Sequence, residues 1–467
     1  MWQIKTFLKS KSLTGGTPEN RSSERYRRIV LSMLAGLSMR GVSAVTMVIS
    51  VPLTINYLGT ERYGMWITMS AMLTILAFAD LGIGNGLLNK LAYAHGRDDR
   101  EGAQRYISSA FIMLSGVALL LGVVFMLIYP HVPWERFFNV TSTQAVRDAG
   151  PTVAVAIGCF LISIPLGIVQ RVQQGYQEGY FDSFWQAVGK CFTLAGVLLA
   201  IYLRASLPWL IAALMLAPIA AQFLNGIILF GIRRPWLRPH WGAVRRSYGQ
   251  ELLEVGLFFF ILQLASVIGY SSDSIVLAHI ISPNAVSEYT IVKQLFSIII
   301  LFLSALLMPT WPAYGEATAR GDRAWVGQTF VRSVAISLSI SIPFSILLVL
   351  LGQQIVKLWV GDAVTPSPLL LVSFGIWTVI SAFGGSVAML LNGLQVIRFQ
   401  AVCSLLMAAS NIVISVVLTE TIGISGVIWG SIVAQLVFIL LPSMVYILRL
   451  LRPPELQLYT DTTRGSK

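Results

Sequence analysis

Long apolar segments recur along the whole chain, and short polar segments separate them. About 20 consecutive apolar residues let a helix cross the roughly 30 Å hydrocarbon core of a bilayer. A transmembrane β-barrel would instead alternate apolar and polar residues over segments of about 10 residues, and the chain shows no such segments. The pattern predicts an all-α polytopic membrane protein with twelve transmembrane helices, at about 29–55, 64–88, 107–129, 151–170, 184–203, 208–231, 253–280, 288–310, 329–351, 367–391, 401–419 and 424–447.

The composition agrees with a membrane protein. Of the 467 residues, 55% are hydrophobic and 12% are charged, whereas soluble domains carry about 25% charged residues. The second span is the least regular, because its end, FADLGIGNGLLNK (78–90), combines Asp80 with glycines.

The net charge of +12 would suit a nucleic-acid-binding protein, but the positions of the basic residues argue against that partner. With twelve spans and both termini inside, the inner segments hold 24 of the 33 Lys and Arg residues, the outer loops hold five and the spans hold four. An excess of basic residues on the cytoplasmic side sets the orientation of membrane proteins. We therefore expect both termini in the cytoplasm, no nucleic-acid partner, and contacts between the basic segments and anionic lipid head groups.

Two halves of the chain resemble each other. Three pairs of segments match at nearly constant separations of 226, 225 and 218 residues: ERYGMW (61–66) with SEYTIV (287–292), Gly96 with Gly321, and GYQEGYF (175–181) with GLQVIRF (393–399). Corresponding helices would then cross in the same direction, as in parallel repeats about an axis along the membrane normal. The expected divisions are a cytoplasmic basic tail, an N-terminal six-helix bundle, a cytoplasmic basic linker, a C-terminal six-helix bundle and a cytoplasmic tail, at 1–28, 29–231, 232–250, 251–448 and 449–467.

Motifs of enzymes and cofactor sites are not evident in the sequence. The glycine-rich GIGNG (82–86) resembles a phosphate-binding loop, but it follows no strand and lies at the end of a membrane span. Close helix approach or a flexible point explains its glycines better. The three cysteines and four histidines are scattered, which favours neither a disulfide framework nor a metal site. We expect no catalytic residues, no cofactor and no metal.

Charged residues inside the spans are the candidate functional residues, because a charge in hydrocarbon costs about 2.5–3.5 kcal/mol on insertion scales. Arg40 stands 11 residues after Ile29, roughly 16 Å into its span. That depth prevents its side chain from reaching the interface, so Arg40 must face the protein interior, either in a structural ion pair or in a polar cavity.

Lys293 and Asp273 form a second candidate site. Lys293 lies five residues into its span, and Asp273 lies at nearly the same depth in the preceding span. Lys293 alone is close enough to the outer interface for its stem to reach water. A Lys293–Asp273 pair or a shared polar cavity explains both residues, whereas exposure to lipid explains neither.

Asp80 has two interpretations, as a structural cap of an interrupted helix or as a cavity residue. Arg40 and Lys293 together indicate an interior polar path with two cations, which suits an anionic substrate group. Phosphate is the obvious candidate, because guanidinium and ammonium groups both bind it well.

The segments YLGTERYGMW, FADLGIGNGLLNKLA, SEYTIVKQLF followed by LLMPTWPAYGEA, and LNGLQVIRFQ occur in order over nearly the whole chain. Their order, their spacing and the duplicated six-span pattern resemble the polysaccharide-transport branch of the MATE-like flippase superfamily, the Wzx-type O-antigen flippases. The fourteen-span murein-precursor flippases are similar but have two further helices.

The resemblance implies a MATE-like fold, with two six-helix bundles forming a V around a central cavity. It also implies movement of an undecaprenyl-diphosphate-linked oligosaccharide from the cytoplasmic to the outer leaflet of a bacterial inner membrane by alternating access. In this family, basic residues of the cavity would bind the diphosphate or acidic sugars, and Arg40 and Lys293 match these basic residues. Asp80 and Asp273 match the acidic positions of the family more loosely. The expected partners are this substrate, membrane lipids and other polysaccharide-assembly proteins.

Two other classes of protein compete with this interpretation. A cation-coupled multidrug exporter of the same superfamily would favour acidic cavity residues, whereas the deepest charge here is Arg40. A membrane glycosyltransferase or polysaccharide polymerase would carry a large outer loop with charged catalytic residues. The longest outer loop, about 130–150, holds few charges, so we expect a transporter and not an enzyme.

Overall fold

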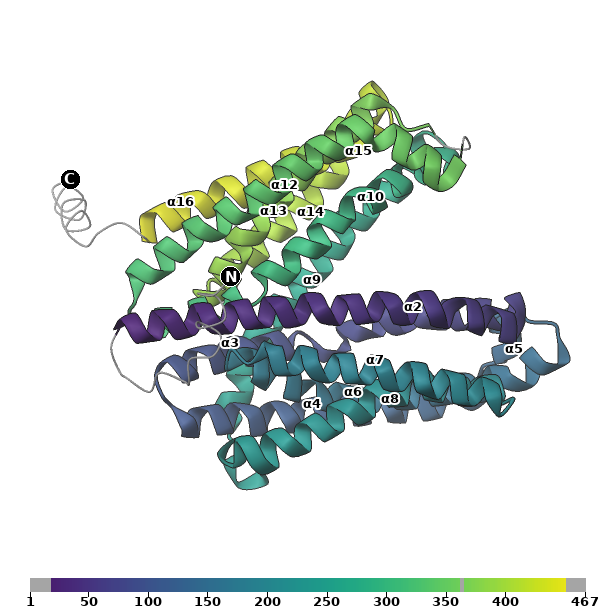
Figure 1. The fold of residues 1–467 in the computed structure, drawn as a ribbon, viewed down its shortest axis with the longest axis horizontal. Coiled ribbons are helices and arrows are strands. Elements are labelled where there is room, and N and C mark those ends of the chain that lie inside the picture. Colours follow the sequence, from purple (N-terminus) through teal and green to yellow (C-terminus); the bar gives the residue numbers. More distant parts are fainter. Residues whose placement is uncertain (1–17, 362–364, 451–467) are drawn as a thin grey trace, which may run out of the picture. The chain divides into compact units, whose positions relative to one another are not determined.

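The computed structural model describes residues 18–361 and 365–450. Throughout these residues the regular secondary structure is helical, and eleven of the described helices are long and apolar enough to cross a membrane. The all-α membrane fold expected from the sequence is therefore confirmed. The chain divides into two compact units on either side of the Phe260–Ile261 bond, and Figure 1 labels the helices of both.

Long helices form the N-terminal unit, and short helices connect them. Its elements are α2 (Pro18–Leu76), η1 (Ala77–Asp80), α3 (Ile83–Gly96), α4 (Arg100–Ile128), η2 (Tyr129–His131), α5 (Trp134–Phe137), α6 (Thr143–Gly175), α7 (Gly179–Tyr202), α8 (Leu207–Ile228), η3 (Leu229–Arg233), η4 (Pro235–Leu237), η5 (Trp241–Ala243) and the start of α9 (Arg246–Ile280).

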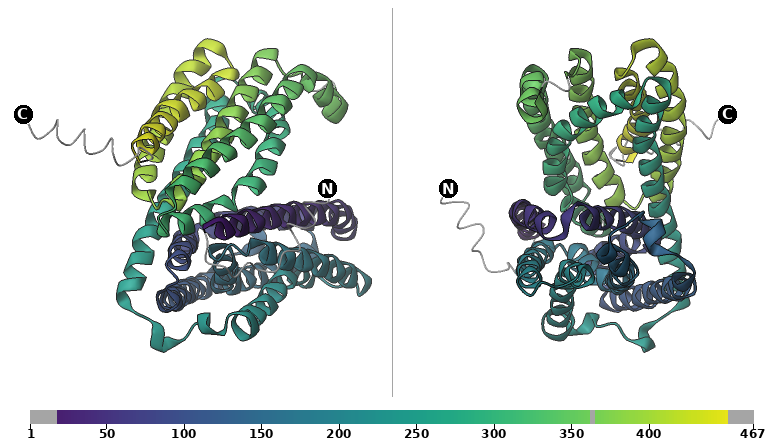
Figure 2. Two further views of the ribbon diagram at one scale, coloured as in Figure 1. Left: turned by 60° about the vertical axis from the view of Figure 1, so that its left-hand side comes forward. Right: turned by 90° about the vertical axis from the view of Figure 1, so that its right-hand side faces the viewer.

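The remainder of α9 and the elements after it form the C-terminal unit. These are α10 (Pro283–Leu307), α11 (Thr310–Ala319), α12 (Arg323–Val360), α13 (Pro368–Gly393), α14 (Ile397–Ile422), α15 (Ser425–Ala434), η7 (Gln435–Leu440) and α16 (Leu441–Leu450). Figure 2 shows that the long helices of each unit run side by side in a bundle.

Helix α2 contains the first predicted span and the start of the second. A straight helix of its 59 residues would be about 88 Å long, nearly three times the thickness of the hydrocarbon core. The helix is broken at Gly59, whose φ of 76° and ψ of 168° are not helical. Leu58, Met65 and Met69 on both sides of this break share one buried cluster. The eleven long helices thus agree with twelve spans, because α2 supplies two.

The second span of each half is interrupted. In the first half η1 follows α2, and Leu81 and Gly82 adopt left-handed φ angles of 51° and 71° before α3 begins. In the second half α10 ends at Leu307, and α11 begins at Thr310 directly after Pro309. Both halves therefore replace one continuous span by a long helix and a short one.

The glycines of the GIGNG segment allow a close helix approach. A Cβ atom on Gly82 would lie 2.2 Å from the carbonyl oxygen of Gly256, and one on Gly86 would lie 3.3 Å from the Gly256 nitrogen. The start of α3 and the first part of α9 thus touch through their backbones. The packing interpretation of this segment is confirmed.

The corners between helices repeat in the two halves. Gln177 after α6 and Gln395 after α13 both have a left-handed φ, of 58° and 59°, and they are 218 residues apart as the sequence match requires. At the other corner the left-handed residues are Asp98 and Gly321, with φ of 56° and 76°. The structural counterpart of Gly321 is therefore Asp98, and the match with Gly96 was wrong by two residues.

The segment 232–250 packs on the N-terminal unit. Leu237 and Ala243 are buried, and the amide of Gln104 on α4 donates a hydrogen bond to the carbonyl oxygen of Arg238 at 3.2 Å. The role of this segment as a linker, and the domain bounds drawn around it, stay predictions.

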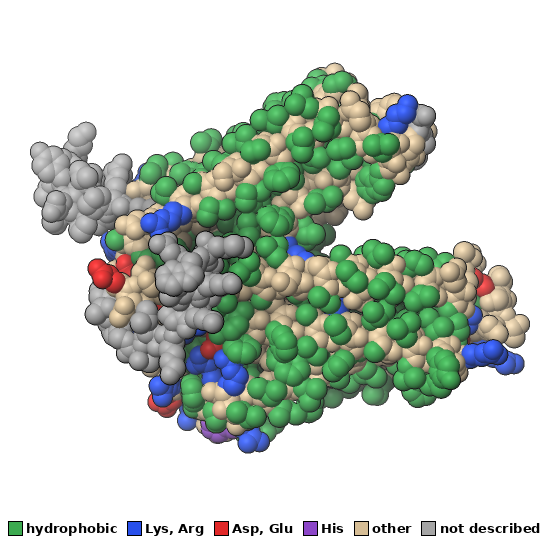
Figure 3. All heavy atoms as spheres, in the orientation of Figure 1, with side chains coloured by type: hydrophobic (Ala, Val, Ile, Leu, Met, Phe, Trp, Pro, Cys, Tyr) green, Lys and Arg blue, Asp and Glu red, His purple; other side chains and the backbone are tan. Residues whose placement is uncertain are grey.

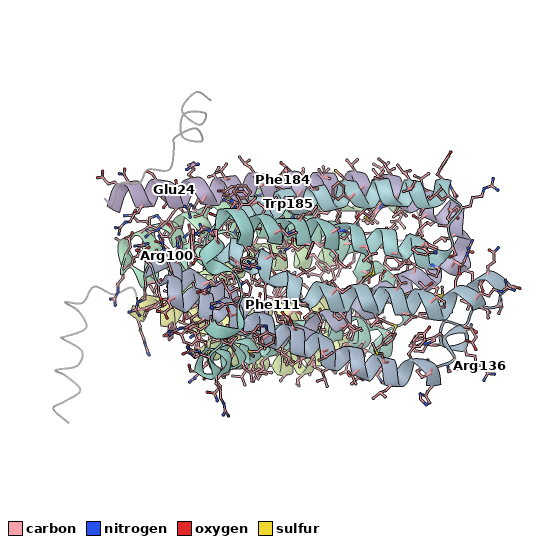
Figure 4. The ribbon with its side chains drawn as sticks, turned by 90° about the horizontal axis from the view of Figure 1, so that it is seen from below. Glu24, Arg100, Phe111, Arg136, Phe184 and Trp185 are labelled. Atoms are coloured by element: carbon pink, nitrogen blue, oxygen red, sulfur yellow. The ribbon has the colours of Figure 1, made fainter. Side chains whose placement is uncertain are left out.

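Hydrophobic side chains cover the sides of both bundles, while Lys and Arg side chains lie mostly toward the helix ends (Figure 3). In the N-terminal unit, Glu24 and Arg100 lie toward one end and Arg136 lies at the other (Figure 4). The predicted topology places these residues on opposite sides of the membrane in the same way. Which end faces the cytoplasm stays a prediction.

Candidate functional site

A cavity of about 570 Å³ lies inside the C-terminal unit, among α9, α10, α13 and α15. This volume falls within the range of about 300–1,000 Å³ that is usual for ligand pockets. Aromatic and aliphatic side chains form most of its wall, and hydroxyl and charged groups form the rest. The lining residues are Asp273, Tyr289, Lys293, Phe296, Ser297, Ile300, Leu301, Ser304, Phe374, Trp377, Thr378, Ser381 and Ile428.

Asp273 on α9 is buried at the wall of this cavity and is 2% exposed. It accepts a hydrogen bond from the hydroxyl of Tyr289 at 2.8 Å, and longer ones from Ser431 at 3.4 Å and Asn411 at 3.5 Å. A buried carboxylate needs such donors, because removing its hydration is costly. The three donors come from three other helices, so Asp273 ties α9 to α10, α14 and α15.

Lys293 lies one helical turn after Tyr289 on α10, and both side chains reach the cavity. Residues four apart share one face of a helix. The ammonium nitrogen of Lys293 is 5.3 Å from the centre of the Tyr289 ring, within the distance of a cation–π contact. Tyr289 therefore contacts both charged residues, with its hydroxyl on Asp273 and its ring near Lys293.

Lys293 and Asp273 line the same cavity, as the sequence led us to expect. The sequence predicted this shared cavity because the two residues lie at similar depths in consecutive spans. Tyr289 was not predicted as a site residue, although it stands four positions before Lys293 in the matching segment SEYTIV. The four-residue spacing between Tyr289 and Lys293 could have identified Tyr289 as a site residue.

A second group of polar residues packs around Asp273 without lining the cavity itself. Asn411 donates a hydrogen bond to the carbonyl oxygen of Gly269 at 2.7 Å, and its own carbonyl oxygen accepts bonds from Ser415 and Ser431, both at 3.1 Å. These residues were not predicted from the sequence. The spacing of Asn411 and Ser415 by four positions in an apolar span was the available signal, because it places both on one helix face.

Arg40 lies on α2 in the N-terminal unit and is partly buried. Asp273 and Lys293 belong to the C-terminal unit. Arg40 lies far from both ends of α2, which agrees with the sequence argument that its side chain is too deep in the span to reach the interface. Its part in substrate binding stays a proposal.

Asp80 ends the 3₁₀ turn η1, and its side chain accepts a hydrogen bond from the backbone N–H of Gly82 at 2.9 Å. This contact forms a turn between η1 and α3, and both interpretations of Asp80 stay predictions. Arg171 acts electrostatically on Asp80, and the predicted fourth span, 151–170, ends just before it. Arg171 instead lies within α6, since this helix continues to Gly175.

No cluster of three or more His, Cys, Asp or Glu side chains that could hold a metal ion occurs among the described residues. Cys159 and Cys403 are buried, Cys191 is exposed, and all three are free thiols. The polar groups of the cavity are thus an ammonium, a carboxylate and hydroxyls. Together they can contact a substrate that has both apolar and polar or anionic parts.

A family model described as "Polysaccharide biosynthesis protein" matches residues 26–317, which is more than half of the chain. The chain belongs to the polysaccharide biosynthesis protein family. A second model, described as "MatE", matches residues 259–417 of this family member. Both matched ranges include Asp273 and Lys293.

A curated relative of this polysaccharide biosynthesis family protein comes from Salmonella typhimurium strain LT2 and is named "Putative O-antigen transporter". The two are 22% identical over 395 residues, which cover 82% of this chain and 88% of the relative.

Solved structures share the fold. A MATE protein in the bent conformation has a TM-score of 0.77 and 16% identity, over 92% of this chain and 96% of its own. An outward-facing multidrug resistance transporter of the MATE family has a TM-score of 0.74 and 17% identity, over 95% of this chain and 97% of its own. The MATE-like fold expected from the sequence is confirmed.

Proposed function

We propose that this protein is a flippase, which moves a polyprenyl-diphosphate-linked oligosaccharide from the cytoplasmic to the outer leaflet of a bacterial inner membrane by alternating access. The family to which the chain belongs supports the link to polysaccharide synthesis. The name of the Salmonella relative supports transport of an O-antigen precursor. The expected partners are the lipid-linked oligosaccharide, membrane lipids and other proteins of polysaccharide assembly, and the expected topology has both termini in the cytoplasm.

The observation that carries this proposal is the cavity of the C-terminal unit. It places the ammonium of Lys293 beside an aromatic wall, in which Phe374 lies 5.4 Å from Tyr289 and 5.9 Å from Phe296 between ring centres. An ammonium group binds phosphate or carboxylate oxygens, and aromatic rings contact the apolar faces of sugars or a lipid chain. A substrate with an anionic head and less polar parts fits both features.

Arg40 supplies the second cation of the proposed path. A guanidinium group binds two phosphate oxygens at once, whereas an ammonium group acts as a point charge. We therefore assign Arg40 to the diphosphate and Lys293, with Asp273, to another part of the substrate. The carboxylate of Asp273 accepts hydrogen bonds and so suits sugar hydroxyl groups.

The test is glycan display in a strain that lacks its own flippase and carries this protein. Arg40→Ala and Lys293→Ala should each lower display by roughly tenfold to a hundredfold, because a hydrogen bond to a charged group contributes about 1.5–3 kcal/mol. Arg40→Lys should retain partial activity, since it keeps the charge and loses the two-point contact. The amount of protein in the membrane should stay near that of the wild type.

Exposed basic residues provide matched controls. Lys357→Ala and Arg136→Ala remove a positive charge from exposed positions and should leave display unchanged. Full display in a well-expressed Arg40→Ala strain would exclude its role in binding. If Arg40→Ala instead lowers protein abundance, Arg40 belongs to a structural ion pair.

A cation-coupled multidrug exporter is the second candidate function, and Asp273 favours it. A buried carboxylate beside Tyr289, Phe374 and Trp377 suits an organic cation, which binds carboxylates and aromatic faces. Resistance of a drug-sensitive strain to cationic dyes separates the two functions. Resistance without glycan display would favour the exporter, and display without resistance would favour the flippase.

A further inference from the structure

Four arginines gather at one end of the N-terminal unit. They are Arg27 and Arg28 near the start of α2 and Arg233 and Arg234 at the end of η3, and we refer to these four as the arginine corner. Three of them, Arg27, Arg28 and Arg233, act electrostatically on Tyr180 at the start of α7. Helices that are far apart in the sequence therefore bring these charges together.

The positive charges of the arginine corner exceed the negative charges that pair with them. Both arginines of α2 pair with Glu24, each at 2.8 Å. Both arginines of η3 pair with Glu178, at 3.2 and 2.7 Å. Four guanidinium groups thus share two carboxylates, which leaves two positive charges. A bound anion would offset this excess, because like charges that lie close together repel one another.

Hydrogen-bond donors of the arginine corner are also left over. Within the described part of the chain, Nε of Arg27 and Nη1 of Arg233 have no hydrogen-bond acceptor, although the latter lies 3.2 Å from Glu178. The two side chains are 20% and 28% exposed, so part of each remains accessible. Guanidinium groups bind phosphate oxygens through pairs of N–H donors. The corner therefore offers both charge and donors to a phosphate group.

Aromatic rings hold two of these arginines in a fixed orientation. The guanidinium carbon of Arg233 lies 3.6 Å from the centre of the Phe181 ring, and that of Arg234 lies 4.3 Å from the centre of the Tyr176 ring. Such contacts are cation–π interactions. The N–H groups of a guanidinium lie in its own plane, so stacking on a ring leaves them free for other partners.

The corresponding corner of the C-terminal unit is built in a different way. The residue 218 positions after Phe181 is Phe399, and its ring is stacked on Tyr446 with the ring centres 5.1 Å apart. The residue 218 positions after Glu178 is Val396. A tyrosine ring thus covers the phenylalanine where the N-terminal unit uses an arginine, so the fold of this corner does not itself require the ion pairs.

The arginine corner lies beside the ends of three predicted spans. The span 29–55 begins and the span 208–231 ends within three residues of its arginines, and the span 184–203 begins shortly after Tyr180. The predicted topology places these three span ends on the cytoplasmic side. Basic pockets between membrane helices on that side bind anionic lipid head groups.

An apolar surface continues from the arginine corner along α7. Phe184 follows Phe181 by three residues and so shares its helix face, and Phe184 is 58% exposed. In Figure 4, Phe184 and Trp185 lie between the end of the unit that holds Glu24 and the end that holds Arg136. A ligand with an anionic head and apolar chains fits this surface, whereas free phosphate would use only the arginines.

We propose that the arginine corner binds the phosphate group of an anionic phospholipid, whose acyl chains lie along α7 past Phe184. The phosphate oxygens accept hydrogen bonds from Arg27 and Arg233, and the negative charge offsets part of the excess positive charge. Binding of this lipid does not depend on the proposed function, because it is measured without transport.

Native mass spectrometry of the purified full-length protein in detergent tests the proposal. The protein is titrated with phosphatidylglycerol, which is anionic, or with phosphatidylethanolamine, which has no net charge. We expect the wild type to bind phosphatidylglycerol more tightly. Inorganic phosphate in excess should not displace this lipid, because it makes no contact with the apolar surface of α7.

The variant that tests the site combines Arg27→Gln with Arg233→Gln. It leaves Glu24 and Glu178 paired with the other two arginines. Binding of phosphatidylglycerol should weaken about 25-fold, since each basic residue near a membrane surface contributes about fivefold. Arg238→Gln is the matched control, because it removes an exposed arginine of the same unit, and it should leave the affinity unchanged.

Photo-cross-linking in a chain that keeps all four arginines gives an independent measurement, which does not require the double variant to fold. A benzophenone amino acid at Phe184 should cross-link to radioactive phosphatidylglycerol more than to radioactive phosphatidylethanolamine. The same group at Trp209, which is 70% exposed near the start of α8, should show no such preference.

Four results would overturn the proposal. They are equal binding of the two lipids by the wild type, equal binding of phosphatidylglycerol by the wild type and the double variant, displacement of the lipid by inorganic phosphate, and equal cross-linking at the two positions. Tighter binding of a polyprenyl diphosphate than of phosphatidylglycerol at the arginine corner would also overturn it, because the corner would then belong to the path of the transport substrate.

Discussion

Tyr289→Phe removes one hydroxyl group from the wall of the cavity and keeps the aromatic ring. The hydroxyl donates to Asp273 at 2.8 Å, and the ring lies near Lys293. The substitution thus separates support of the carboxylate from contact with the ammonium. We expect it to lower the free energy of unfolding of the protein.

The magnitude follows from the other donors to Asp273. The contacts from Ser431 and Asn411, at 3.4 and 3.5 Å, are longer than the usual range of about 2.7–3.2 Å, so Tyr289 supplies the one short hydrogen bond. A bond to a charged group contributes about 1.5–3 kcal/mol, but side-chain bonds inside membrane proteins average about 0.6 and reach about 1.7 kcal/mol. We expect a loss of about 1–2 kcal/mol.

Reversible unfolding in mixed lipid–detergent micelles measures this loss for wild type and variant. Tyr202→Phe is the matched control, because Tyr202 is 84% exposed, and it should change the free energy of unfolding by less than about 0.5 kcal/mol. Combining Tyr289→Phe with Asp273→Asn should cost less than the sum of the two single changes, since both remove the same contact.

Equal stability of Tyr289→Phe and Tyr202→Phe would refute this reasoning. It would mean that Asp273 obtains its stabilisation from groups other than the Tyr289 hydroxyl. Full additivity in the double variant would lead to the same conclusion.

Three further predictions concern topology, packing and access. Reporter fusions should place both termini and the 232–250 segment in the cytoplasm, and an outside location for that segment would contradict the twelve-span topology. Gly393→Ala should lower the free energy of unfolding by at least about 1–3 kcal/mol, because its Cβ would lie 2.4 Å from the Cβ of a buried tyrosine, whereas Gly327→Ala, with nothing within 4 Å, should stabilise its helix by up to about 1 kcal/mol. Cysteines at Asp273 and Lys293 should both react with a water-soluble thiol reagent from the outer side in some conformation, and inaccessibility of both under all conditions would assign them a structural role.

The apolar pattern of the sequence predicted the spans well, because hydrocarbon imposes one local requirement on every crossing segment. Backbone groups in lipid must be hydrogen-bonded within the segment itself, so about 20 apolar residues are read as a helix whatever they pack against. The interruption of the second span was also visible, since Asp80 and the glycines of GIGNG break that pattern. The bend at Gly59 was not located, because a glycine alone does not fix a left-handed φ.

Site residues were predictable only where a charge interrupted an apolar span. Lys293 and Asp273 met this condition, and they line one cavity. Tyr289, Asn411 and Ser431 carry no charge and are common in membrane helices. The four-residue spacings of Tyr289 from Lys293 and of Asn411 from Ser415 place each pair on one helix face, but spacing does not tell whether that face lines a cavity or packs on another helix.

The sequence by itself determined the membrane class, the number of spans and the duplication, because these follow from periodicity and composition along the chain. Beyond the cavity that Asp273 and Lys293 share, tertiary structure decided which polar groups meet. It brought Asp273 to the hydroxyl of Tyr289 and Arg171 within electrostatic reach of Asp80 and Asp182. The physical reason is that a hydrogen bond or an ion pair forms only when two groups lie within a few ångströms of each other. Helix packing sets the distances between groups on different helices, and packing cannot be read from the order of residues along the chain.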